Sequence, residues 1–216
     1  MKYPNAFKGV NKVYIAEILT IVILLLVGIA GVLVYLPAYQ EENSILLSIV
    51  GGLFLAASVG LLFTYVIKFA GLYKAGRDEY ILKVAYYVVL ISFLLILTSF
   101  ILSFFKETVF ASKIVDLVVS FLDIVITIII LFGLISLADK SNQKLMSKKG
   151  KRLVVLIIFT FVVSYTFTLL SKFLPLTNKN GLLMGFSIAA LVLEIIAYIL
   201  YLIYLHKSVQ MLGQLK

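Results

Sequence analysis

The chain has 216 residues, of which 63% are hydrophobic and 13% charged, and its formal net charge is +9. Soluble domains are roughly half apolar and a quarter charged, so this chain has too little polar surface to coat a water-soluble globule. Its mean hydropathy of +1.16 indicates that lipid is the solvent for most of it. The absence of cysteine and the presence of one histidine, His206, exclude disulfides, thiol nucleophiles and multi-histidine metal or haem sites.

Six apolar segments are long enough to cross a bilayer, because a hydrocarbon core of about 30 Å needs about 20 helical residues. The sequence therefore predicts an all-α integral membrane protein in one six-helix domain over residues 1–216. Helices are expected because unpaired backbone groups cannot be left in lipid. The first segment is too long for a secretory signal and lacks an Ala-x-Ala cleavage site, so it is expected to be retained. The predicted spans are approximately residues 14–36, 44–67, 81–104, 112–137, 153–173 and 182–205.

The basic residues are unevenly distributed between the two predicted sides of the membrane. Fifteen of the 19 lysines and arginines lie in the N-terminus, the second and fourth connections and the C-terminus, with Lys68 assigned to the second connection. The positive-inside rule then predicts a multi-pass protein of the cytoplasmic membrane with both termini in the cytoplasm. This topology explains the basic excess, which also attracts anionic lipid headgroups, and no nucleic-acid partner is expected.

Four lysines near the inner helix ends recur at intervals of 66, 66 and 67 residues, and a small residue follows each one. We interpret this register as three tandem two-helix hairpins, residues 8–73, 74–139 and 140–206, about a pseudo-threefold axis along the membrane normal. The alternative is that any six-helix protein has evenly spaced loops with lysines inside. The pairs are Lys8–Gly9, Lys74–Ala75, Lys140–Ser141 and Lys207–Ser208.

Two predicted helices carry acids near the middle of the membrane. On the fourth helix, Asp123 belongs to a stripe at spacings of three and four residues, which places its members on one helix face. On the sixth helix, Glu194 lies near the midpoint of a similar stripe. The fourth-helix stripe is Lys113, Asp116, Ser120, Asp123 and Thr127, in which Lys113 is expected to pair with Asp116; the sixth-helix stripe is Ser187, Glu194, Tyr198 and Tyr201.

The second predicted helix presents small residues at a strict spacing of four, a face that lets helices pack closely in lipid. We expect the second, fourth and sixth helices to face the interior of the bundle. Two remaining titratable residues have plainer expected roles: Glu17 snorkels or caps near the inner boundary, and His206 is solvated at the interface. The small-residue stripe is Ser48, Gly52, Ala56, Gly60, Thr64 and Lys68.

A carboxylate at the bilayer centre costs about 2.5 to 3.5 kcal/mol, and no Lys or Arg is expected at the depth of Asp123 and Glu194. The functional hypothesis is a transport or solute-binding membrane component that binds a proton, another cation or an amine solute. The alternative is an accessory or scaffold protein in which neutral carboxyls only fasten the bundle, or in which they contact a partner membrane subunit. The predicted binding residues are Asp123, Glu194, Thr127, Ser120, Tyr198 and Tyr201.

Enzyme classes are mostly excluded by missing motifs. His-Glu-x-x-His and Gly-x-x-x-x-Gly-Lys-[Ser/Thr] do not occur. Asp116 and Asp123 lie about 10.5 Å apart along one helix axis, too far to share a proton as a catalytic dyad. The sequence therefore predicts a protein without enzymatic activity, cofactor or metal.

Overall fold

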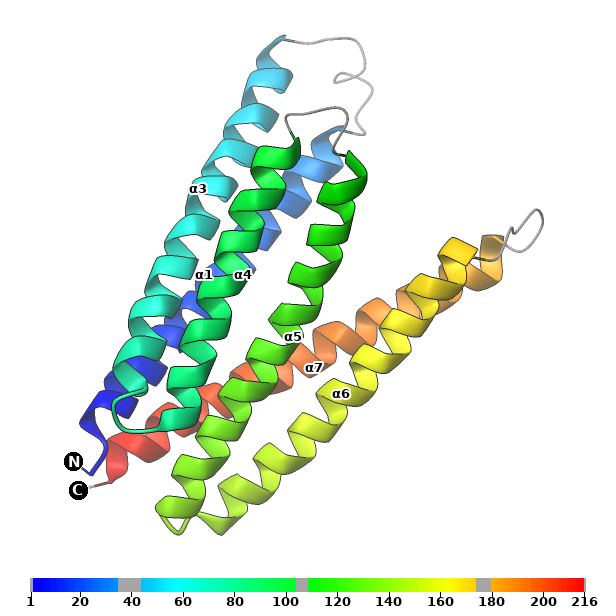
Figure 1. The fold of residues 1–216 in the computed structure, drawn as a ribbon. Coiled ribbons are helices and arrows are strands. Elements are labelled where there is room, and N and C mark those ends of the chain that lie inside the picture. Colours follow the sequence, from blue (N-terminus) through cyan, green and yellow to red (C-terminus); the bar gives the residue numbers. More distant parts are fainter. Residues whose placement is uncertain (1, 35–43, 104–108, 174–179, 216) are drawn as a thin grey trace.

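The computed structural model describes residues 2–34, 44–103, 109–173 and 180–215, and the regular structure within these ranges is helical (Figure 1). The prediction of an all-α protein is confirmed for this part of the chain. The helices are α1 (Pro4–Val34), α3 (Ser44–Ala75), α4 (Tyr80–Ser103), α5 (Val109–Lys140), α6 (Lys144–Phe173) and α7 (Asn180–Gln214).

Five helices, α1, α3, α4, α5 and α7, are long and apolar enough to cross a membrane. Many of their large apolar side chains are exposed, for example Leu55 at 69% and Val32 at 67%, as expected for helices that face lipid. A multi-pass membrane protein in a bilayer is thus supported. The basic residues in the first turns of α6 prevent its described part from meeting the same criterion of length, hydropathy and charge. A membrane crossing by α6 therefore stays a prediction.

The helices form a closed ring in chain order. Each helix packs against its neighbours along the chain, and α7 packs back against α1. Figure 1 shows the hairpin of α6 and α7 leaning away from the other four helices, most clearly at the end opposite the termini. Both termini lie at one end of the bundle, where the Lys2 amide donates a hydrogen bond to the Leu215 carbonyl at 3.3 Å.

The hydrophobic core is concentrated in the half of the bundle that carries the termini. Buried side chains from all six helices meet there, among them Val13, Leu82, Leu131 and Leu205. Toward the opposite end, fewer of the described side chains are buried between helices, in agreement with the lean of α6 and α7. The ring is therefore filled at one end and less tightly packed beyond it.

The helices at the terminal end continue past the predicted spans. All four lysines of the 66-residue register lie on helices rather than in turns: Lys74 and Lys140 in last turns, and Lys8 and Lys207 well inside α1 and α7. Helical hydrogen bonding can continue past the hydrocarbon edge, because hydropathy limits only the lipid-immersed length. The connections at this end are correspondingly short, residues 76–79 and 141–143, and Asn142 takes a φ of 57° in the second.

The predicted small-residue face of α3 is only partly used in packing. Gly52 has no atom within 4 Å of the position of an added Cβ, whereas Gly60 lies against Ile23 of α1. A closer approach of α1 and α3 lies elsewhere, at Gly9 and Gly71. A Cβ on Gly9 would clash with the Gly71 carbonyl oxygen, so backbone lies directly on backbone at this crossing.

Candidate functional site

A buried glutamate of α1 is the centre of the polar interior. Glu17 is 6% exposed, and its Oε1 lies 2.7 Å from Nζ of Lys68 on α3. The Lys68 side chain is 20% exposed. Burying a carboxylate alone would be prohibitive, and a close ammonium partner offsets that penalty.

Two tyrosines of α7 complete the coordination of Glu17. Tyr198 donates a hydrogen bond to Oε2 at 2.9 Å, and the buried Tyr201 donates to Oε1 at 3.4 Å. The Glu17 carboxylate on α1 therefore contacts side chains from both α3 and α7. This arrangement joins the first two helices to the last one, where the ring closes.

This cluster corrects two expectations. Glu17 does not snorkel at the inner boundary, and Lys68 does not belong to a connection, because α3 continues to Ala75 and carries Lys68 within the bundle. The sequence offered one signal for the pair. Glu17 lies toward the inner end of the first predicted span and Lys68 directly follows the inner end of the second, and an antiparallel hairpin brings such positions to similar depth.

Asp123 lies beside this cluster in a cavity of about 350 Å³, here called the Asp123 cavity. Asp123 is exposed and shares the cavity with both members of the Glu17–Lys68 pair, so a cation does reach its depth. The hydroxyl-bearing residues Thr20, Thr64 and Tyr65 also line the cavity. Two acids, one base and several hydroxyl groups therefore line this cavity, together with apolar side chains.

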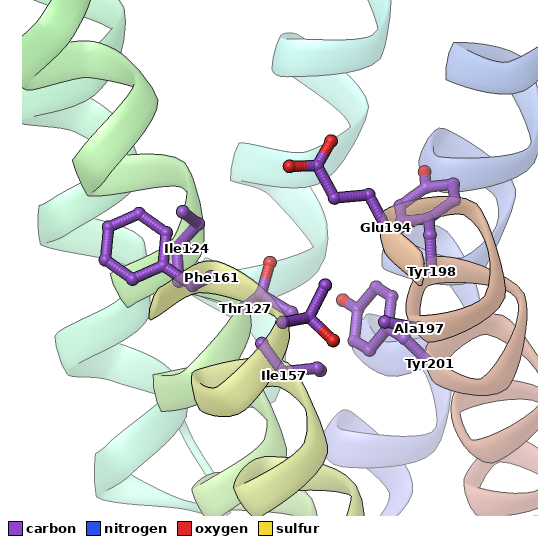
Figure 2. Close-up of a pocket in the computed structure, with 9 residues that line it drawn as sticks. Ile124, Thr127, Ile157, Phe161, Glu194, Ala197, Tyr198 and Tyr201 are labelled. Carbon is purple, nitrogen blue, oxygen red and sulfur yellow. The ribbon is translucent and has the colours of Figure 1, made fainter. Parts of the chain in front are cut away.

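Glu194 lies in a second cavity of about 260 Å³, the Glu194 cavity, between α5, α6 and α7. In Figure 2 its side chain extends from α7 into the space that separates it from Ile124 and Phe161. Thr160 of α6 lines the same cavity; it is buried, and its hydroxyl has no hydrogen-bond partner among the described residues.

The two cavities adjoin, because Thr127 and Tyr198 line both. Thr127 donates a hydrogen bond to the Asp123 carbonyl one turn back at 2.9 Å, which fixes its orientation on α5. The two cavities therefore share part of their walls, with the exposed residues Asp123 in one and Glu194 in the other.

The six predicted binding residues are placed as follows. Asp123, Thr127, Glu194, Tyr198 and Tyr201 each line one or both cavities, while the exposed Ser120 lines neither. The second, fourth and sixth helices contribute as expected, and the sequence reasoning missed the contribution of α1. The predicted pairing of Lys113 with Asp116, and the Ser187 side chain, lie outside the described residues.

Other titratable residues lie outside this region. His206 is exposed, stacks obliquely on Tyr14 and lies 3.0 Å from the Gln210 amide nitrogen. Within the described ranges, no three His, Cys, Asp or Glu side chains lie close enough to hold a metal ion. The chain matches no protein-family model, no curated protein and no solved structure.

Proposed function

We propose that this protein is a small membrane transport or solute-binding component whose interior accepts a cationic solute. The observation that carries the proposal is the placement of Asp123 and Glu194 in two adjoining cavities of the ring interior. Neither carboxylate forms an ion pair with a described residue. Both are therefore available to a ligand.

The charge balance of the cavities favours a cation. Lys68 is the sole basic residue in the two described linings, and it is already paired with Glu17. No described cation forms an ion pair with Asp123 or Glu194, so a cation that enters the cavities would meet two carboxyl groups in a region where electrostatic attraction is stronger than in water. The volumes suit a small amine or a hydrated ion, because they lie near the lower end of the range for ligand pockets.

The topology completes the proposal. Six crossings of the cytoplasmic membrane follow from the apolar segments of the sequence. The distribution of basic residues places both termini in the cytoplasm. Three hairpin repeats follow from the 66-residue lysine register. The sequence contains no phosphate-binding loop, so movement of the solute would use an ion gradient or a separate energising subunit. The proposed role is binding and transport, not catalysis.

A second candidate function is an accessory or scaffold membrane protein. The coordination of Glu17 by side chains from α3 and α7 favours it, because such a contact fastens three helices whether or not a solute binds. In that case Asp123 and Glu194 would be dispensable for any binding activity. The exposed apolar helix faces would then contact a partner subunit.

Binding measurements on acid-to-amide variants separate the two functions. The purified protein in nanodiscs is titrated with a panel of small primary and quaternary amines, and binding is measured by equilibrium dialysis. Asp123→Asn and Glu194→Gln should each weaken binding, and the double variant should abolish it. The matched control is Asp139→Asn, because Asp139 is an exposed acid of α5 outside both cavities. Failure of the native protein to bind any amine, or unchanged binding by the double variant, would favour the scaffold.

A further inference from the structure

A third cavity, of about 330 Å³, lies between α6 and α7 toward the end that carries the termini. Three of its lining side chains are cationic, Lys149 and Arg152 from α6 and Lys207 from α7. No acidic residue is part of the described lining. Most of the remaining lining is apolar: Leu153, Leu156, Leu200 and Ile203.

The sequence spacing explains how charge and apolar surface are separated in this cavity. Lys149, Arg152, Leu153 and Leu156 repeat at the spacing of one helix face, and so do Leu200, Ile203, Tyr204 and Lys207. The two helices are successive and pack antiparallel, so the charged ends of both faces meet and the apolar ends meet. The lining is therefore basic at the terminal end and apolar toward the membrane.

The positive charge in this cavity is not neutralised within the described protein. Lys149, Arg152 and Lys207 form no ion pair with a described residue, whereas the neighbouring Lys151 lies 3.6 Å from Asp139. Tyr204 also lines the cavity, but its hydroxyl is buried against Gly150 of α6.

We propose that this cavity binds the phosphate headgroup of an anionic phospholipid, with an acyl chain along its apolar part. Three cations without acids select a phosphate group. The adjoining Leu153, Leu156, Leu200 and Ile203 favour a lipid over free phosphate, because inorganic phosphate would gain nothing from apolar surface. Basic pockets between membrane helices are suited to such headgroups. The proposal is independent of the amine site, since no residue lines both regions.

Native mass spectrometry of the full chain in detergent tests the proposal, with phosphatidylglycerol, phosphatidylcholine and inorganic phosphate as three separate probes. The native protein should retain phosphatidylglycerol in preference to the other two. The variant Lys149→Gln/Arg152→Gln/Lys207→Gln should lose about tenfold or more in affinity for it. The matched control is Lys83→Gln/Lys144→Gln/Lys148→Gln, which removes the same charge from exposed positions outside this cavity and should change affinity little.

Equal losses in the two triple variants would overturn the proposal, because they would show general surface attraction. Equal retention of phosphatidylcholine, or binding of inorganic phosphate as tight as that of the lipid, would also overturn it. Lys207→Gln provides a milder variant at an exposed position of the same cavity. Should the first triple variant fail to fold, severalfold weaker phosphatidylglycerol binding by Lys207→Gln would support the proposal, and unchanged binding would contradict it.

Discussion

The Glu17 carboxylate and the Lys68 ammonium group lie 2.7 Å apart, in different helices and largely buried. Tyr198 and Tyr201 bind the same carboxylate from a third helix. The pair thus marks the point where the ring of helices closes and borders the cavity that contains Asp123. Its energetic contribution and the accessibility of that cavity can be measured separately.

Breaking the Glu17–Lys68 pair should be strongly destabilising. Glu17→Ala leaves the Lys68 charge without its partner, and we expect a loss of about 3–5 kcal/mol in the free energy of unfolding. The double variant Glu17→Gln/Lys68→Met should lose less free energy of unfolding than the two single variants together, because no buried charge remains. Unfolding in mixed micelles with increasing sodium dodecyl sulfate measures the stability of each variant.

The exposed pair between Asp139 and Lys151 is the control, since each side chain is more than half exposed at a separation of 3.6 Å. Asp139→Asn should change stability by less than about 1 kcal/mol. An equally small effect of Glu17→Ala would contradict the role assigned to the buried pair.

The two tyrosines on Glu17 should contribute unequally. Tyr198→Phe removes a hydrogen bond of 2.9 Å to a charged acceptor, and we expect a loss of about 1.5–3 kcal/mol. Tyr201→Phe removes a longer contact of 3.4 Å and should cost less while keeping its buried ring in place. The same unfolding assay measures both losses of stability, and a larger loss for Tyr201→Phe than for Tyr198→Phe would contradict this ranking.

Glycine-to-alanine substitutions should have opposite effects on stability at two positions of α1. At Gly9 the added Cβ would clash with the Gly71 carbonyl oxygen, so the helices must separate, at a cost of about 1–3 kcal/mol. At Gly28 no atom lies within 4 Å, and alanine should stabilise the helix by up to about 1 kcal/mol. Thermal unfolding of the two variants in detergent compares them. Destabilisation of similar size at both positions would argue against the close crossing.

Asp78, in the connection between α3 and α4, should stabilise the start of α1. Its Oδ2 accepts hydrogen bonds of 2.8 Å from the backbone amides of both Asn5 and Ala6. Asp78→Ala should therefore cost about 1–2 kcal/mol, and Asp78→Asn less, because the amide oxygen remains an acceptor. Hydrogen exchange at Asn5 and Ala6 should accelerate in the alanine variant. Unchanged protection there would show that another group caps the helix.

The sequence allowed the helices to be predicted, because length and hydropathy are local properties. Counting residues predicts that Asp123 and Glu194 lie near the midplane, and both line cavities between helices. The end of α3 could not be found in this way. Hydropathy falls at Lys68, but helical hydrogen bonding continues to Ala75, so a residue assigned to a connection is a buried partner.

The neighbours across helices were harder to predict than the helices themselves. The contact of Glu17 with Tyr198 depends on how α1 and α7 rotate about their axes where the ring closes, and no local pattern records that rotation. The small-residue stripe of α3 shows the same limit. Its spacing indicated a packing face, yet Gly71, outside the stripe, makes the closest crossing.

The central claim is that the cavities at Asp123 and Glu194 admit water and small cations. The chain contains no cysteine, so single cysteines can be introduced without background. In lipid nanodiscs, Thr127→Cys, at the junction of the cavities, is compared with Leu55→Cys, which is 69% exposed on the outer face of α3. A small, positively charged thiosulfonate reagent reacts with the thiolate, which forms only where water reaches. We predict rapid labelling of Thr127→Cys and little labelling of Leu55→Cys; equal rates, or no labelling at Thr127 until the protein is unfolded, would contradict the claim.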